Sequence, residues 1–190
     1  YYLKPVLDED ELKSNGYIEL KYNENMNLIT FQNLAKQLEK RTVAYISSSE
    51  KFSSYTGSKE FFVGKGNIKN PDGLKKVELN KENTLGIDEI IAVEIIVDLE
   101  AYENKDIVIT LGADENILDL QDTAYKYINI GNALDEYNKT KKHWKDLLSN
   151  IQVETPVESM NILLNGWLLY QTLVARLFAR SGYYQSGGAY

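Results

Sequence analysis

The sequence predicts a mixed fold in which β-structure comes first and α-structure follows. Three observations predict it. Short apolar runs alternate with polar residues as far as residue 113. Helical spacing of apolar residues begins at residue 114, and the most apolar helical stretch comes last. We therefore expect part of a large antiparallel β-sandwich in 1–113, a helical linker in 114–154, and a further helix with the loop after it in 155–190.

The strands of the sandwich are expected at runs of β-branched, aromatic and alternating residues. These runs are 16–22, 41–49, 90–100 and 106–112. In the third run, apolar side chains from Val93 to Leu99 alternate with Glu94 and Asp98. Because a polar turn at 103–105 separates the third run from the fourth, we expect these two to pair as an antiparallel hairpin.

The linker is expected to be one amphipathic helix over about 114–150. Its apolar stripe consists of Leu134, Tyr137, Trp144, Leu147 and Leu148. Lysines lie mostly outside this stripe, so the helix is expected to pack on one side only. We expect Trp144 to pack in a core rather than to stack on a ligand.

The last helix has clear start and stop signals. Thr155 supplies a capping hydroxyl, Pro156 suits the first helical position, and Glu158 follows as a reciprocal cap. Ser181-Gly182 ends the helix, because glycine accepts the left-handed cap conformation. Between them the helix is apolar nearly all round, with Trp167 also expected in a core. Such a helix needs partners, so we expect the chain to be a fragment of a larger protein.

Composition restricts the classes of partner and compartment. The net charge of −7 argues against a nucleic-acid backbone, which needs clustered lysine and arginine. The absence of cysteine excludes disulfides and thiolate metal sites and favours a reducing, cytoplasmic location, and His143 alone excludes a multi-histidine site. No run approaches a membrane span. The 14 tyrosines suit either sugar binding or ordinary sheets.

The C-terminal stretch "NILLNGWLLYQTLVARLFARSGYYQSGGAY" (161–190) resembles the opening of the helical barrel in glycoside hydrolase family 94. The runs "FSSYTGSKEFFVGKGN" (52–67) and 86–113 look like strands of the family's N-terminal sandwich. The resemblance is closest to the branch that contains 1,2-β-oligoglucan phosphorylase and the C-terminal region of cyclic β-1,2-glucan synthase. Two departures are Lys65, where the family has arginine, and a turn at 100–105 that lacks an expected glycine.

The resemblance implies an N-terminal sandwich, a helical linker and an (α/α)6 barrel, of which 155–190 would supply the first helix. It also implies an inverting phosphorylase that cleaves β-1,2-glucooligosaccharides with inorganic phosphate and releases α-glucose 1-phosphate. Phosphate is then a co-substrate, and no cofactor or metal is expected. The general acid and the phosphate site are expected outside this chain, so no catalytic residue is assigned within it.

Partners and alternatives follow from the same resemblance. The expected partners are a β-glucan oligosaccharide, phosphate, the rest of the barrel and, in one arrangement, a second subunit of a homo-oligomer. One alternative is part of a cyclic β-1,2-glucan synthase that controls chain length by phosphorolysis. Another is a non-enzymatic carbohydrate-binding β-sandwich, against which the apolar final helix argues.

Arg180 is the first candidate substrate-binding residue. By resemblance it holds the glucosyl unit at the cleavage subsite, where a guanidinium can donate a fork of hydrogen bonds to adjacent hydroxyls. The alternative is an arginine that only completes a helix C-terminus. Tyr184 and Gln185 are the other candidates, because a tyrosine face can stack on a pyranose and an amide can bond hydroxyls. The glycines in 63–67 are not expected to hold phosphate, since no helix follows them.

Overall fold

The computed structural model describes residues 1–7, 16–36, 41–86 and 89–175. The chain divides into two compact units, which comprise 1–133 and 134–190. The first unit contains the sheets and the second contains helices, and each is described by itself.

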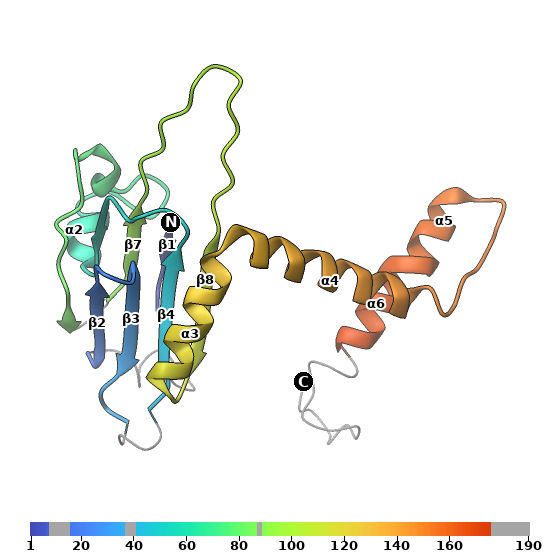
Figure 1. Ribbon diagram of the computed structural model, residues 1–190, viewed down its shortest axis with the longest axis horizontal. Coiled ribbons are helices and arrows are strands. Elements are labelled where there is room, and N and C mark those ends of the chain that lie inside the picture. Colours follow the sequence, from blue (N-terminus) through green and yellow to red (C-terminus); the bar gives the residue numbers. More distant parts are fainter. Residues whose placement is uncertain (8–15, 37–40, 87–88, 176–190) are drawn as a thin grey trace. The chain divides into compact units, whose positions relative to one another are not determined.

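The described strands of the first unit form two antiparallel sheets (Figure 1). In strand order, the smaller sheet contains β1 (Tyr2–Leu3), β7 (Ile91–Glu94) and β5 (Ser54–Thr56). The larger contains β6 (Leu85–Gly86), β2 (Ile18–Asn23), β3 (Leu28–Asn33), β4 (Val43–Ser48) and β8 (Ile109–Asp114). The central strands of the larger sheet pair over most of their length, with Ile29 opposite Tyr22 in β2 and Ile46 in β4.

The main core of this unit lies between the two sheets. Every second residue of β2 and β3 enters it, as Ile18, Leu20, Ile29 and Phe31 show, while residues of the other parity face away. The smaller sheet contributes Tyr55, Ile91 and Val93. Burial of one such large apolar side chain stabilises the fold by roughly 1.5–3 kcal/mol. The arrangement is therefore a sandwich, as the alternation of the sequence predicts.

Helix α3 (Ile117–Ile128) covers the opposite face of the larger sheet, in front of β4 and β8 in Figure 1. Its buried residues Leu120 and Ala124 pack against Leu28 and Tyr45. The Asn116 side chain caps the helix by accepting a hydrogen bond from the amide of Leu118 at 3.0 Å. The sandwich is thus covered by a helix on this side.

A third, smaller core supports the outer face of β7. Helix α2 (Lys59–Val63) and the 3-10 turn η2 (Asp72–Lys75) lie here. Phe62 of α2 packs with Leu79, Ile90 and Ala92. The side chain of Ser58 caps α2. This layer and the main core together bury three consecutive residues of β7, from Ile91 to Val93.

The structure confirms strands within 16–22, 41–49 and 106–112, which contain or overlap β2, β4 and β8. The predicted hairpin of 90–100 with 106–112 is wrong. Strand β7 ends at Glu94 and pairs with β1 and β5, whereas β8 pairs with β4 in the other sheet. The reason is that β1 and β5 occupy the two edges of β7, which leaves no free edge for β8. The segment 95–108 therefore crosses from one sheet to the other.

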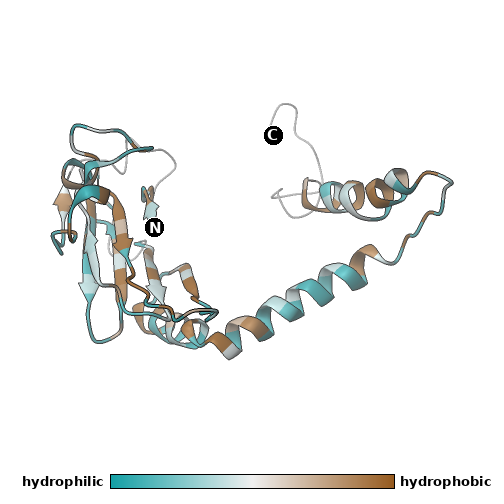
Figure 2. Cartoon of the chain, turned by 90° about the horizontal axis from the view of Figure 1, so that it is seen from above, coloured by the Kyte–Doolittle hydropathy of each residue, from teal (hydrophilic) through white to brown (hydrophobic). Residues whose placement is uncertain are grey.

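The single linker helix predicted over 114–150 is in fact two helices, α3 and α4 (Ile130–Leu148). The break is at Asn129, whose ψ of 120° is extended rather than helical. Its side chain accepts a hydrogen bond from the amide of Asn132 at 3.1 Å and so caps the start of α4. Figure 2 shows brown residues in the strands and in the last helix, and teal residues along most of α4.

The last described helix consists of α5 (Glu158–Ile162), the π-helical turn η3 (Leu163–Trp167) and α6 (Leu168–Leu173). It begins at Glu158, so the prediction of Pro156 as the first helical residue is wrong by two positions. Within η3 the amide of Leu168 donates to the carbonyl of Leu163, five residues earlier. Among the described residues, no helix is both long enough and apolar enough to cross a membrane.

Candidate functional site

The candidate substrate-binding residues Arg180, Tyr184 and Gln185 lie outside the described residues, as does the predicted helix stop at Ser181-Gly182. Their roles stay predictions. The helix that precedes them in the sequence is described as far as residue 175. Side-chain hydrogen bonds attach it to the segment before it.

Two asparagines, one turn apart on this helix, fasten the connection that precedes it. The Asn165 side chain accepts from the amide of Val153 at 2.7 Å and donates to the Val153 carbonyl at 2.8 Å. Asn161 makes the same pair of bonds with Thr155, at 2.8 and 3.1 Å. Each side-chain amide thereby bonds both the N–H and the carbonyl of one backbone residue, as a neighbouring strand would. The sequence analysis missed this device; its signal is the four-residue spacing of two asparagines beside an extended segment.

The aromatic residues of the second unit gather around Tyr170. Its ring lies 4.9 Å from that of Trp144 and 6.3 Å from that of Trp167. Trp144 is half-buried, but Trp167 is 59% exposed. The predicted core position of Trp167 is therefore not found within the described part of the chain.

A cavity of about 700 Å³ lies beside α2 in the first unit. Its wall includes Ser58, Glu60, Gly64, Glu82, Thr84 and Glu89. The described part of its wall comes from 58–64, 82–85 and Glu89. Its size falls within the range of small-molecule sites, about 300–1,000 Å³. The sequence analysis assigned no function to these residues.

Two buried polar atoms in this wall make no hydrogen bond of ordinary length to the described residues, although their side chains are neighbours. They are the Thr84 hydroxyl oxygen and Oε2 of Glu89, both buried. Burial raises the pKa of the Glu89 carboxyl, the Thr84 side chain lowers it as a neighbouring hydrogen-bond donor, and the charge of Glu82 raises it. The Thr84 side chain packs directly against Gly57. A Cβ at position 57 would lie 2.0 Å from the Thr84 hydroxyl oxygen, so a larger residue would not fit. The Thr84 hydroxyl and the Glu89 carboxyl are therefore neighbours in this wall rather than two isolated groups.

The glycine-containing loop 63–67 borders the cavity but does not form a phosphate cradle. Helix α2 precedes this loop, and Gly64 ends the helix with a φ of 58°. The amide of Lys65 donates to the Asp72 carboxylate at 2.9 Å. That amide is therefore already bonded to a carboxylate within the chain.

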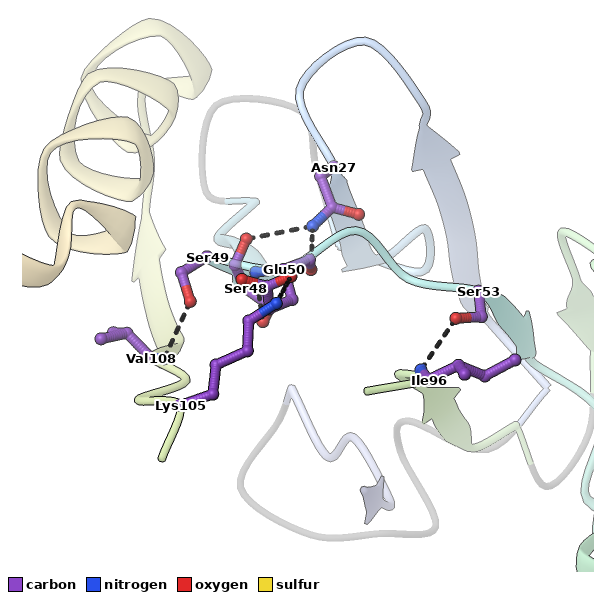
Figure 3. Close-up of polar contacts among 8 residues, drawn as sticks. All are labelled: Asn27, Ser48, Ser49, Glu50, Ser53, Ile96, Lys105 and Val108. Carbon is purple, nitrogen blue, oxygen red and sulfur yellow. Dashed lines mark hydrogen bonds and ion pairs between the residues drawn. The ribbon is translucent and has the colours of Figure 1, made fainter. Parts of the chain in front are cut away.

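The segment 95–108 is anchored at both ends by one serine-rich stretch (Figure 3). At its start, the amide of Ile96 donates to the Ser53 hydroxyl at 2.9 Å. At its end, Ser49 and Val108 exchange two bonds of 2.9 and 3.0 Å. Lys105 also lies 2.8 Å from the Glu50 carboxylate. In Figure 1 this segment projects from the sheets as a long green loop.

Asn27 holds the anchoring stretch itself in place. Its side-chain amide donates to the carbonyls of Ser48 at 3.0 Å and Glu50 at 2.8 Å, as Figure 3 shows. Its side-chain oxygen accepts from the amide of Phe52 and from the Tyr22 hydroxyl. The φ of Asn27 is 48°, a conformation that asparagine tolerates better than most residues.

The far end of 95–108 is a tight turn closed by the amide of Glu103, which donates to the Glu100 carbonyl at 3.0 Å. Tyr102 occupies the position in this turn that favours glycine, with a φ of 67° and a fully exposed side chain. The sequence analysis expected a glycine in this turn, and the positive φ explains why. The loop presents an aromatic ring at the cost of local backbone strain.

Comparison with known proteins places these features in a family. The sequence model described as "Glycosyl hydrolase 94, supersandwich domain" matches residues 1–130. The one described as "Glycosyl hydrolase 94 superfamily, catalytic domain" matches residues 143–190. The chain is also 29% identical over 151 residues to cyclic beta-(1,2)-glucan synthase NdvB of Rhizobium meliloti (strain 1021). This match covers 77% of the chain but only 5% of the relative.

Proposed function

The chain belongs to glycoside hydrolase family 94, and on that premise we propose that it takes part in the inverting phosphorolysis of β-1,2-glucooligosaccharides. The observation that carries the proposal is the succession of two matches, first to the family's sandwich and then to its catalytic domain. The match to a β-1,2-glucan synthase supports the choice of linkage.

In the proposed reaction, an oxygen of inorganic phosphate attacks the anomeric carbon from the face opposite the leaving group. The bond from that carbon to the glycosidic oxygen breaks, and a carboxylic acid protonates the departing oxygen. The products are α-glucose 1-phosphate and an oligosaccharide shortened by one unit. One protein carboxyl suffices, because phosphate replaces the activated water of an inverting hydrolase. We expect that acid outside residues 1–190.

Residues of this chain would contribute binding rather than proton transfer. Arg180 is proposed to hold the glucosyl unit at the cleavage subsite, with Tyr184 and Gln185 beside it. The hydrogen bonds of Asn161 to Thr155 and of Asn165 to Val153 fix the start of the helix in which Arg180 is expected to lie. Positioning of this kind lowers the barrier by holding the reacting atoms in an attack geometry.

The test is an assay of the complete protein with phosphate and glucooligosaccharides of β-1,2, β-1,3 and β-1,4 linkage. We expect phosphate-dependent release of α-glucose 1-phosphate from the β-1,2 series. Release of free glucose without phosphate would contradict phosphorolysis. Binding without turnover would instead favour the non-enzymatic carbohydrate-binding sandwich.

The similarity to NdvB favours a second candidate, the phosphorolytic region of a cyclic β-1,2-glucan synthase. The sequence of the complete protein separates the two candidates. A membrane-embedded synthase region ahead of residue 1 would support the second, and a protein without such a region would support the first.

A further inference from the structure

The π-helical turn η3 lies in the middle of a helix that is α-helical on either side of it. Ile162 before the turn and Leu168 after it both have α-helical dihedral angles. An unconstrained helix closes each turn over four residues, but here the amide of Leu168 donates to the carbonyl of Leu163, five residues earlier. Turns of this kind are rare, and they occur frequently at functional sites. The turn therefore requires a contact that stabilises it.

Asn165 supplies such a contact from inside the turn. Its side chain bonds the amide and the carbonyl of Val153, at 2.7 and 2.8 Å, and so attaches η3 to the segment before the helix. Packing does not stabilise the turn in the described part of the chain, because no residue of η3 is buried there. The turn is therefore held by the two bonds of Asn165 rather than by a core.

The turn determines which later residue of the helix occupies a given place. One residue is added to the helix at η3. If η3 relaxed to an α-helical turn, the place of every later residue would be taken by the residue that precedes it in the sequence. Ala179 would then stand where Arg180 is proposed to bind the glucosyl unit. Because alanine has no hydrogen-bonding group, the contact with the sugar would be lost.

We propose that Asn165 is a positioning residue for the glucosyl site, because it maintains the turn that brings Arg180 to that site. This role rests on the proposed function, in which Arg180 holds the glucosyl unit. It differs from the role of Asn161, which lies in α5 before the turn and attaches the helix start to Thr155 whichever way η3 is closed. Asn165 acts through Arg180 and does not itself contact the substrate.

The test is steady-state phosphorolysis of β-1,2-glucooligosaccharides by the complete protein and its variants. Asn165→Ala removes both bonds to Val153 and should lower kcat/KM for the oligosaccharide by about 10²-fold, the effect of a misplacement of about 1 Å. The KM for phosphate should be unchanged, since the phosphate site is expected outside this chain.

Deletion of Gly166 in the Asn165→Ala variant should restore most of the lost rate. The deletion removes the added residue, so an α-helical turn in place of η3 returns Arg180 to its site. It removes no packed side chain, and a Cβ at position 166 would meet no heavy atom within 4 Å. A residue that only stabilises the fold would not be rescued in this way.

Asn161→Ala is the matched comparison, because it removes the same pair of bonds one helical turn earlier. Any loss of rate that it causes should not be restored by deletion of Gly166. Melting curves and a crystal structure of each variant show whether it folds and how the turn is closed. The role of Asn165 is refuted if Asn165→Ala keeps the wild-type kcat/KM, if the deletion does not restore it, or if the deletion restores both variants equally.

Binding of the oligosaccharide is measured in parallel by calorimetry. A wild type that binds it but releases no glucose 1-phosphate refutes the proposed function, and the same pattern among the binding constants of the variants then decides on Asn165. A wild type that releases glucose 1-phosphate, with the pattern absent, refutes only the role of Asn165. A wild type that neither binds nor cleaves the oligosaccharide refutes both.

Discussion

The two units of this chain differ in how far they bury their apolar side chains. In residues 1–133, apolar side chains from both sheets and from α3 meet in closed cores. In the described part of 134–190, no residue of α5, η3 or α6 is buried, although Ile162, Trp167 and Leu168 are large and apolar. The first unit thus obtains its stability from its own residues. The second has apolar surface for which a catalytic domain would supply partners.

This difference predicts whether a substitution in each unit should change the free energy of unfolding or the catalytic rate. Changes in the first unit should alter the free energy of unfolding, because its contacts are complete within it. Changes in the second should alter catalysis by the complete protein more than the stability of this chain. The following predictions test that division, from the largest effect to the smallest.

Phe31→Ala in the main core should lower the free energy of unfolding of the 190-residue chain by about 3–5 kcal/mol, because it leaves a cavity between the sheets. Trp167→Ala, which removes a larger but 59% exposed side chain, should change it by less than about 1 kcal/mol. Urea denaturation measures both. Equal losses would break the comparison between the two units.

Arg180→Ala in the complete protein should lower kcat and kcat/KM by about 10²–10³-fold, if a charge-assisted contact of roughly 3–4 kcal/mol forms in the transition state. Arg180→Lys should not restore the rate, because an ammonium lacks the planar fork. Steady-state phosphorolysis with parallel melting curves separates function from structure. A normal kcat with a lowered Tm would assign Arg180 to the helix end alone.

Asn27→Ala should destabilise the first unit by about 2–3 kcal/mol, because it removes the side chain that holds the 48–52 stretch. Asn27→Gly removes the same amide but accepts the φ of 48°, so it should cost less by about 1 kcal/mol. Asn23→Ala is the control, since its side chain accepts one exposed bond from Met26. Urea denaturation distinguishes the three, and equal costs for both Asn27 variants would exclude a contribution from backbone strain.

Tyr102→Gly should stabilise the first unit by up to about 1 kcal/mol, because glycine adopts a φ of 67° without strain. Tyr102→Ala keeps a Cβ and should give no gain. Thermal denaturation compares them. A loss of stability in the glycine variant would mean that the exposed ring makes a stabilising contact.

Glu89→Gln should change how stability depends on pH. The folded-state pKa of Glu89 is raised above its ordinary 4.5 by burial, so its stabilising contribution is present below that value. The contribution is lost as pH rises through the raised pKa. At pH 7 the variant should therefore be more stable than the wild type, by less than about 1 kcal/mol because the group is partly solvated. Urea denaturation at pH 4 and pH 7 checks this, with Glu60→Gln as an exposed control; a destabilised variant at pH 7 would contradict it.

The sequence predicts the class of fold and the strands β2, β4 and β8, because alternation of apolar and polar residues records which face of a strand is buried. Alternation does not record which strands are neighbours, so the pairing of β7 could not be read from it. The break at Asn129 was missed because helical spacing continues across a single non-helical residue. Strand β3, at the centre of the larger sheet, was not predicted.

The cavity could not be predicted, because it is formed by residues that are ordinary in their own segments. Thr84 and Glu89 become notable only when the fold places their side chains next to each other in one wall. The strained turn could be recognised from the sequence, because a glycine was expected in 100–105 and is absent. The structure shows a left-handed φ at Tyr102 in this turn. A position that requires an unusual backbone conformation can be recognised from sequence more readily than a cavity.

The π-helical turn η3 has a consequence for the angular phase of the last helix. A turn closed over five residues contains one residue more than an α-helical turn, and one residue corresponds to about 100° of rotation. Apolar positions before Leu163 and after Trp167 are therefore out of phase with a single straight stripe. The two halves of the helix present apolar residues in two directions, and a surface complementary to this helix must meet it on two adjacent sides.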